Sequence, residues 1–316
     1  MKNILVTGGR GFIGQFLCSK LIDINFCKKI ICFDSASNFS KNQNLIDKNK
    51  INRIKYVRGE IEDPLLVENT IRKYKPELIF HLAGVSVART ENLTYFYAKR
   101  GPIDGTQNLI IALKNLNHKK FNFKKFIYFS SSMVYGDFKR SIAKESDSTN
   151  PRGIYGITKK IGEEITKNLC NEYKINFSII RPSAVYGPND PNKRVSQIFI
   201  ERALKKKEIF VFSKNEKLDF TYVEDLVSGA VLVAKNKKAN GEIFNITFGK
   251  SRSLKEFLNI LVKRFPNLRY SFKKKIKPIS KRGTLSILKA RKLLNYKPKY
   301  DLEKGINKII NLLTKS

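Results

Sequence analysis

The sequence predicts an α/β fold: a Rossmann-type, doubly wound parallel sheet with a smaller, discontinuous C-terminal lobe. Short, continuously apolar segments alternate with amphipathic segments through residues 1–182, and a glycine-rich turn follows the first of them. Strands that are apolar along their whole length are typical of a parallel sheet covered by helices on both faces. A glycine-rich turn between a first strand and a first helix is typical of a nucleotide-binding βαβ unit.

The apolar segments of this first part are the expected strands. They span residues 3–7, 30–34, 54–57, 77–83, 125–132 and 177–182. Between them, apolar residues recur at helical spacing, which predicts a helix in each longer connection. One such helix follows the glycine-rich turn, and the others span 63–74, 92–116 and 154–174.

Beyond residue 182 the alternation is less regular. We expect helices at 195–206, 223–236, 253–264, 285–295 and 302–314, with strands at 209–212, 219–222 and 242–247. The simplest division places residues 1–182, joined by 219–248, in a dinucleotide-binding domain. Residues 183–218 and 249–316 then form the smaller, substrate-binding lobe.

Composition argues for a cytoplasmic protein that holds no metal. No run approaches the ~18 apolar residues of a membrane span. The first residues already form a strand and a turn, so no cleavable signal peptide is expected. The four cysteines, at positions 18, 27, 32 and 170, make no C-x-x-C pair, and the chain has two histidines. We therefore expect buried thiols in a reduced compartment.

The formal net charge is +35 at pH 7, but the lysines are spread along the whole chain. Such a distribution indicates lysine used as the general surface residue, and no specific nucleic-acid site is expected. Non-specific attraction to polyanions at low salt follows from the charge, and so does attraction of an anionic small substrate.

The glycine-rich turn predicts a dinucleotide site. Gly8, Gly11 and Gly14 stand directly after the first strand and at the start of a helix, where backbone N–H groups can approach a pyrophosphate. Twenty residues beyond Gly14, Asp34 closes the second strand. A carboxylate there accepts hydrogen bonds from the adenosine ribose and repels a 2′-phosphate. The expected cofactor is therefore NAD rather than NADP.

Further motifs follow in a fixed order, and together they resemble the extended short-chain dehydrogenases/reductases of the NAD-dependent epimerase/dehydratase group, which act on nucleotide sugars. The motifs are Gly59-Glu60-Ile61, His81-Leu82-Ala83-Gly84, Ser130-Ser131-Ser132-Met133-Val134-Tyr135-Gly136, Tyr155-x-x-x-Lys159, Arg181-Pro182 and Asp219-Phe220-Thr221-Tyr222-Val223. A closing segment at 281–306 extends the resemblance over essentially the whole chain.

The resemblance implies further cofactor contacts. Glu60 and Ile61 would flank the adenine, and Leu82 to Gly84 would pass under the nicotinamide-side ribose. The remaining residues expected at the cofactor are Phe12 and Ile13 beside the glycines, Ser35 and Asn38 after Asp34, Ala83, and Pro182.

The reacting groups are expected to be Tyr155, Lys159 and Ser131. Tyr155 and Lys159 stand four apart, on one face of the expected helix. A free tyrosine is too weakly ionised near neutral pH to act as a base, and a nearby ammonium lowers its pKa. Tyr155 would then move the hydroxyl proton that accompanies hydride transfer. The resemblance makes Ser131 the hydroxyl that aligns the substrate oxygen, with Ser132 beside it.

The chain lacks the residues with which other members of this group carry out dehydration or 3,5-epimerisation. Dehydratases of this group carry Asp-Glu after the catalytic hydroxyl, where this chain has Ser132 and Met133. The 3,5-epimerases/reductases use a Cys/His pair, and Met133 stands at the Cys position. These positions favour oxidation at a single sugar carbinol.

Other positions depart from the family pattern. Ala184 replaces an asparagine, Leu218 replaces a phosphate-binding arginine, and an asparagine is lost within 100–106. Lys217 (with Lys214 nearby) is the cation expected to compensate, and Arg282 keeps the second phosphate-binding position. The expected substrate contacts are therefore Ser131, Ser132, Tyr155, Lys217 and Arg282.

Three functional hypotheses remain. The first is an NAD-dependent epimerase that acts on a nucleotide-diphosphate sugar at C4. The second is a nucleotide-sugar dehydrogenase or ketoreductase that uses the same Tyr155 and Lys159. The third is a non-catalytic dinucleotide-binding protein with a positive surface for RNA. The resemblance also implies a homodimer built from the helices near 92–116 and 154–174.

Overall fold

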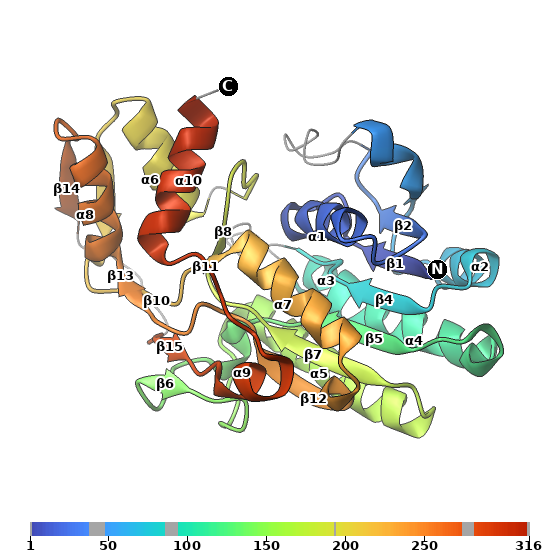
Figure 1. The fold of residues 1–316 in the computed structure, drawn as a ribbon. Helices are drawn as coiled ribbons and strands as arrows, with labels where there is room; N and C mark the ends of the chain where they lie inside the picture. Colours follow the sequence, from blue (N-terminus) through green and yellow to red (C-terminus); the bar gives the residue numbers. More distant parts are fainter. Residues whose placement is uncertain (1, 38–47, 86–93, 193, 274–280, 315–316) are drawn as a thin grey trace.

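A seven-stranded parallel sheet forms the centre of the computed structural model, which describes residues 2–37, 48–85, 94–192, 194–273 and 281–314 (Figure 1). The strand order is β12-β7-β5-β4-β1-β2-β3. Because β1 pairs with both β2 and β4, the order reverses between β1 and β4. In such sheets the ligand crevice lies outside the carboxyl ends of the strands at this point. The strands are β1 (Asn3–Thr7), β2 (Lys29–Asp34), β3 (Ile54–Arg58), β4 (Leu78–His81), β5 (Lys125–Phe129), β7 (Phe177–Arg181) and β12 (Glu242–Asn245).

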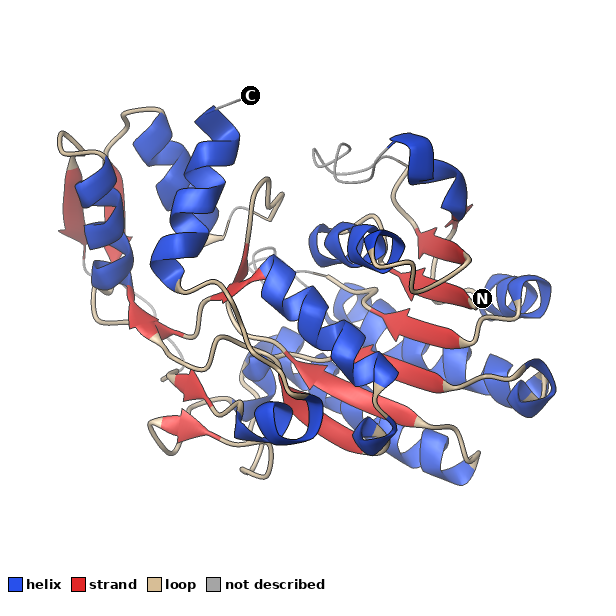
Figure 2. Cartoon of the chain, viewed as in Figure 1, coloured by secondary structure: helices blue, strands red, loops and turns tan. Residues whose placement is uncertain are grey.

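Helices cover both faces of this sheet (Figure 2). Ile4 and Val6 of β1 belong to one apolar core and Leu5 to the other, because neighbouring side chains of a strand point to opposite faces. The first core includes α1 (Phe12–Asp23), α7 (Val223–Lys235) and α9 (Leu288–Leu294). The second includes α2 (Pro64–Tyr74), α4 (Thr106–Asn115) and α5 (Gly153–Glu172).

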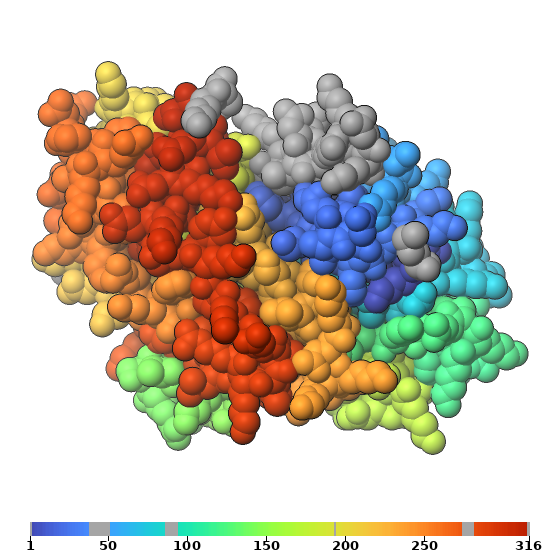
Figure 3. All heavy atoms as spheres, viewed as in Figure 1, coloured from blue at the N-terminus to red at the C-terminus, as the bar shows by residue number. Residues whose placement is uncertain are grey.

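A third apolar core forms the smaller lobe, at the upper left of Figure 1. Phe199, Phe220 and Phe257 pack ring against ring at its centre. The lobe contains α6 (Val195–Leu204), α8 (Leu254–Arg264), α10 (Leu302–Thr314), β9 (Ile209–Phe212), β10 (Lys217–Leu218), β13 (Arg252–Ser253) and β14 (Tyr270–Lys273). Figure 3 shows that α10 and α8 form one continuous surface of this lobe.

Short elements complete the fold. Two small parallel pairs join β6 (Ile142–Ala143) to β15 (Thr284–Leu285) and β8 (Val185–Tyr186) to β11 (Thr221–Tyr222). The short helical segments are α3 (Tyr95–Lys99), η2 (Lys48–Arg53), η4 (Arg100–Gly105), η5 (His118–Phe121), η6 (Ser132–Tyr135) and η7 (Lys237–Ala239). Within the described ranges, no helix combines the length and the apolar character needed to cross a bilayer.

The fold class expected from the sequence is confirmed, and the seven strands of the main sheet lie where apolar segments predicted them. The expected strand at 219–222 is wrong in its extent: only Thr221–Tyr222 (β11) pairs there, and the buried Asp219 separates it from β10. The division into domains stays a prediction. Helix α9, which that division gives to the smaller lobe, packs into the core of the sheet.

The expected single helix at 92–116 is also wrong. Within the described residues it consists of α3, the π-helical segment η4 and α4. Pro102 explains the break, because proline has no N–H to donate and its ring crowds the preceding turn of an α-helix. The wider π-turn accommodates it. At Gly101, a Cβ atom would lie 2.4 Å from the Ala83 carbonyl oxygen, so this segment packs directly on the end of β4.

Candidate active site

The glycine-rich turn forms a close-packed cradle at the carboxyl end of β1. Gly8 has φ 69°, and a Cβ atom there would lie 2.9 Å from the backbone nitrogen of Ala83. A Cβ at Gly14 would lie 2.2 Å from the Gly8 carbonyl oxygen. Helix α1 then begins at Phe12, and no side chain of the described chain caps it at Gly11. Its first backbone N–H groups are thus available to an anion.

Asp34 closes β2 beside this cradle. Its carboxylate accepts hydrogen bonds from the backbone N–H groups of Arg10 (2.8 Å) and Ala36 (3.0 Å). The Arg10 guanidinium in turn donates to the carbonyls of Ala36, at 2.6 Å, and Ser37. Asp34 is therefore held next to the turn, where an adenosine ribose would bind. Ser35 is exposed beside it, and Asn38 lies outside the described residues.

The end of β4 carries the contacts expected for the nicotinamide side. The Thr7 hydroxyl lies 2.6 Å from His81 Nδ1 and accepts a hydrogen bond from the backbone N–H of Ala83. Gly84 follows at φ 149°, and a Cβ there would lie 3.8 Å from Lys159 Nζ. Gly84 thus lies directly against the ammonium of Lys159.

The adenine-side residues lie apart from this contact. Glu60 is exposed, whereas Ile61 is buried. The Ile61 carbonyl accepts a hydrogen bond from Asn108 of α4 at 3.1 Å. Ile13 is half-buried in the first turn of α1, and Pro182 is buried after β7. Their positions are compatible with the cofactor contacts inferred from the resemblance, which stay predictions.

Ser131, Tyr155 and Lys159 are brought together from two elements. Tyr155 and Lys159 occupy the first two turns of α5, and Ser131 is the N-cap of η6, directly after β5. The Ser131 hydroxyl lies beside the Tyr155 phenol and acts to lower its pKa. Lys159 Nζ donates to the Phe129 carbonyl at 2.7 Å. The Ser131 hydroxyl and the Tyr155 phenol thus lie together after β5, and the Lys159 ammonium lies between the ends of β5 and β4.

Burial shifts the pKa of both titrating groups. It raises the pKa of Tyr155, while the charge of Arg194 and the Ser131 hydroxyl act in the opposite direction. Burial lowers the pKa of Lys159 to about 8, against the charge of Glu163. The sequence predicted that Lys159 would favour the phenolate of Tyr155. In the structure the cation with the largest effect on Tyr155 is Arg194.

Sequence reasoning missed Arg194. The residue precedes α6, and its guanidinium pairs with the buried carboxylate of Asp190 at 2.6 Å. It also lies over the ring of Phe12, 5.9 Å from the centroid. The available signal was the four-residue spacing of Asp190 and Arg194. Nothing local indicated that this pair would face Tyr155.

Arg282, which the resemblance expects to contact the substrate, lies against Met133 and Glu216. Its Nη1 is 3.6 Å from the sulfur of Met133, and its Nη2 is 3.6 Å from Glu216 Oε1. Its Nε is buried and has no hydrogen-bond partner among the described residues. The guanidinium therefore retains donor capacity beside Met133, the residue that follows Ser131 and Ser132. This orphaned donor fits an anionic group of a substrate.

Lys217, the other cation expected at this site, lies elsewhere. It is exposed on β10, which pairs with β13, and its charge acts on Glu256. The next residue, Leu218, points the opposite way and is 6% exposed in the core of the smaller lobe. No contact joins Lys217 to Arg282 in the described part of the chain. The arginine lost at 218 is thus not visibly compensated by Lys217.

Together these features define a dinucleotide-dependent enzyme of the short-chain dehydrogenase/reductase class. Three features fit NAD: the glycine turn, which is too tight for a side chain, the start of α1, which has no side-chain cap, and the carboxylate of Asp34. The family model described as "NAD dependent epimerase/dehydratase family" matches residues 4–247. The chain belongs to this family, and it is an NAD-dependent enzyme.

Relatives extend over nearly the full length of the chain. A Methanocaldococcus jannaschii protein, named only as a candidate UDP-glucose 4-epimerase, is 34% identical over 98% of this chain and 97% of its own. The crystal structure of Thermotoga maritima UDP-glucose 4-epimerase with UDP-glucose is 28% identical, with a TM-score of 0.88 and 99% of both chains covered. The structure of Bacillus cereus UDP-glucuronic acid 4-epimerase in complex with UDP-glucuronic acid and NAD is 26% identical and has a TM-score of 0.85. The match covers 98% of this chain and 99% of the Bacillus cereus chain.

Proposed function

We propose that this enzyme epimerises a nucleotide-diphosphate sugar at C4 through a transient 4-keto sugar. The observation that carries the proposal is the convergence of Ser131, Tyr155 and Lys159 beside the cofactor cradle. NAD, when bound, supplies the hydride acceptor and donor. The protein's own groups then have to hold the sugar hydroxyl and move its proton.

Each of these groups has a separate task. The Ser131 hydroxyl holds the C4 oxygen against Tyr155, and the Tyr155 oxygen takes the hydroxyl proton as the carbinol becomes a ketone. After the keto sugar has rotated, Tyr155 returns the proton to the new alcohol. Lys159, whose ammonium lies against Gly84, would bind the nicotinamide-side ribose, and Arg194 is the cation that favours the ionised form of Tyr155. Ser132 and Met133 offer no acid or base for elimination of water.

An anionic substrate is supported by Arg282 and by the net charge of +35. UDP-sugars are the first candidates to test, because the two structural relatives described above bind UDP-sugars. The alternative is a dehydrogenase or ketoreductase with the same reacting groups. The two differ in cofactor use: the epimerase regenerates its cofactor, whereas the alternative consumes NAD or NADH.

The decisive experiment incubates the purified enzyme with UDP-, GDP-, CDP- and dTDP-sugars and follows sugar identity by NMR. A C4 epimer formed without net change in absorbance at 340 nm supports the proposal. Stoichiometric formation or loss of NADH would replace it with the alternative. Absence of conversion of any sugar, with NAD bound, would exclude both.

We further propose a homodimer and a cytoplasmic location. Large apolar side chains are exposed on the two helices that the resemblance assigns to a four-helix contact: Tyr95, Phe96 and Tyr97 on α3, and Ile154 and Ile157 on α5. The four cysteines are free and buried, which suits a reducing compartment. Light scattering tests the dimer: Phe96→Glu is expected to yield monomers, and a monomeric wild type would refute it.

A further inference from the structure

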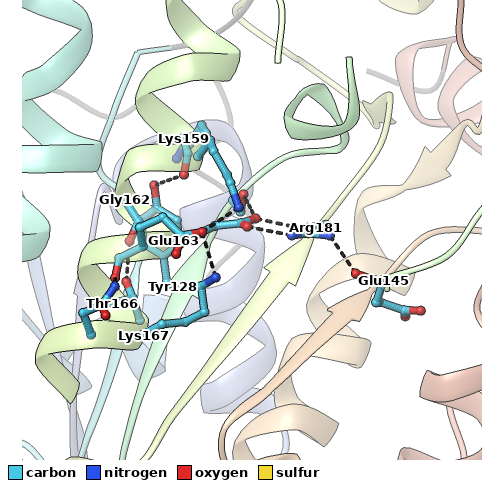
Figure 4. A network of polar contacts seen from close by, with 12 residues as sticks. Tyr128, Glu145, Lys159, Gly162, Glu163, Thr166, Lys167 and Arg181 are labelled. Atoms are coloured by element: carbon cyan, nitrogen blue, oxygen red, sulfur yellow. Dashed lines mark hydrogen bonds and ion pairs between the residues drawn. The ribbon is translucent and has the colours of Figure 1, made fainter. Parts of the chain in front are cut away.

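A buried ion pair lies one helical turn beyond the reacting lysine. Glu163 follows Lys159 by four residues on α5, and its side chain is fully buried. Arg181, at the end of β7, holds both carboxylate oxygens, with Nε to Oε1 at 2.8 Å and Nη2 to Oε2 at 2.7 Å (Figure 4). The Ser130 hydroxyl donates to Oε1 at 2.5 Å. Glu163 is thus clamped from two strands.

Stability is a weak explanation for this pair. Removing two charges from water costs several kcal/mol per ion, and apolar replacements of such pairs are often neutral or stabilising. Its position suggests another role. Lys159 is 4% exposed and, within the described residues, its ammonium has one acceptor, the Phe129 carbonyl. An ammonium carries three donors, so this one is poorly satisfied by hydrogen bonds.

Glu163 is the anion whose field opposes the loss of that proton. Burial lowers the pKa of Lys159 and the negative charge of Glu163 raises it. With both effects included, the pKa is about 8. The surrounding groups do not substitute for it. His81 of β4 is neutral because burial lowers its pKa to about 3, and Tyr128 of β5 has a pKa well above its ordinary value.

Charged groups on the other elements packed against α5 are engaged elsewhere. In η4, Arg100 pairs with Glu62 at 3.1 Å, and Asp104 pairs with Lys99 at 2.5 Å. Arg181 itself is positive. Of the described charged groups near Lys159, Glu163 is therefore the one that favours the ammonium.

Arg181 is held from its other side as well. It donates to the Glu145 carbonyl at 3.3 Å and lies over the ring of Tyr135, 4.8 Å from the centroid. Figure 4 shows it between Glu163 and Glu145. This second set of contacts keeps the guanidinium aimed at the carboxylate of Glu163.

We infer that Glu163, clamped by Arg181 and Ser130, is a positioning residue that keeps Lys159 charged in a dry site. It acts through Lys159 and does not touch the substrate. The inference rests on the proposed function for its catalytic consequence. The charge of Lys159 can be measured without any substrate.

The experiment is an NMR titration of protein labelled with ¹³Cε-lysine, between pH 6 and 10. The Lys159 signal is assigned by its loss in Lys159→Met. Lys125 is an internal control: it is buried at the opposite end of β5, donates to the carbonyls of Val233 and Asn236, and also has a pKa lowered to about 8 by burial.

In Glu163→Gln the Lys159 midpoint is expected to fall by roughly one pH unit while the Lys125 midpoint stays. Glu163→Asp keeps the negative charge, so the Lys159 midpoint is expected to stay near its wild-type value. Glu172→Gln, at the exposed end of α5, is expected to leave the Lys159 midpoint unchanged. If Glu163→Gln does not fold, the neutral double variant Glu163→Gln/Arg181→Gln replaces it. An unmoved Lys159 midpoint, or an equal shift of Lys125, would overturn the inference.

The alkaline limb of the kcat profile is expected to move with the Lys159 midpoint, to lower pH. A parallel loss of activity at every pH, with an unmoved limb, would show that the pair serves folding only and would contradict the inference. A wild type without epimerase activity would refute the proposed function, and the NMR titration would still decide the role of Glu163.

Discussion

Arg194 of the smaller lobe stabilises the ionised form of Tyr155 on helix α5, across the junction between the lobe and the sheet. Asp190, buried and 2.6 Å away, holds the guanidinium in this position. The relationship joins the reacting phenol to a loop of the smaller lobe. A cation placed this way favours proton removal from the substrate only if Tyr155 begins the reaction ionised.

Replacing Arg194 is therefore expected to alter the pH dependence of catalysis. Burial raises the pKa of Tyr155 and Arg194 lowers it, so Arg194→Gln raises it further. Because the ionised form is the base, the acidic limb of the kcat profile moves to higher pH, and kcat at neutral pH falls roughly tenfold. Arg194→Lys keeps the positive charge and is expected to shift the acidic limb less than Arg194→Gln does.

The control for this prediction is Lys205→Gln, which removes the same charge from an exposed position directly after α6. It is expected to leave the profile in place. A proportional loss of kcat at all pH values in Arg194→Gln, without movement of the limb, would contradict the electrostatic role.

Tyr155→Phe removes the proton carrier and preserves the ring. We expect kcat to fall by roughly 10²- to 10⁴-fold, since this is the usual contribution of a positioned acid/base. NAD affinity, measured by fluorescence quenching or calorimetry, is expected to change little, because the cradle of Gly8, Gly11 and Gly14 is untouched. Full activity of the variant would exclude the proposed mechanism.

Glu216 is expected to compete with an anionic substrate for Arg282, if Arg282 binds the diphosphate as proposed. Its Oε1 is 3.6 Å from Nη2 of the guanidinium, so an incoming anion must share or displace it. Glu216→Gln is expected to tighten binding of UDP several-fold, whereas Arg282→Gln weakens it. Calorimetry with UDP alone gives the dissociation constants. Equal affinities in Glu216→Gln and wild type would show that the diphosphate does not reach Arg282.

The backbone of Ala184 has φ 36°, in the left-handed region that residues other than glycine rarely adopt. Its carbonyl accepts a hydrogen bond from the Thr221 N–H at 3.3 Å, which ties this backbone to β11. Ala184→Gly relieves the strain of about 1–2 kcal/mol but adds freedom to the unfolded chain. The net increase in the free energy of unfolding is expected to be about 0.5–1 kcal/mol.

Urea denaturation measures this change. Ala234→Gly, within helix α7, provides the matched comparison and is expected to destabilise by about 1 kcal/mol, because glycine is a poor helix former. If both variants lose stability equally, Ala184 is not strained.

The fold class, the NAD cofactor and the placement of Tyr155 and Lys159 on one helix could be predicted because their signals are local. Gly8 to Gly14 form a turn whose geometry follows from neighbouring residues, and Tyr155 and Lys159 share a helix face by spacing alone. Pro102 shows the limit of such reasoning. The apolar pattern predicted one long helix, whereas a single proline and close packing on Ala83 converted part of it to a π-helix.

The sequence by itself thus determined the fold class and the NAD cofactor, and it singled out Tyr155, Lys159 and Ser131 as the groups proposed to react. Only the tertiary structure decided which distant charges face the site: Arg194 at Tyr155 and Glu216 at Arg282. The physical reason is that electrostatic effects depend on distance and burial in the folded protein. Arg194 is thirty-nine positions from Tyr155 in the chain, and Glu216 is sixty-six from Arg282. Packing of the smaller lobe on the sheet brings them together.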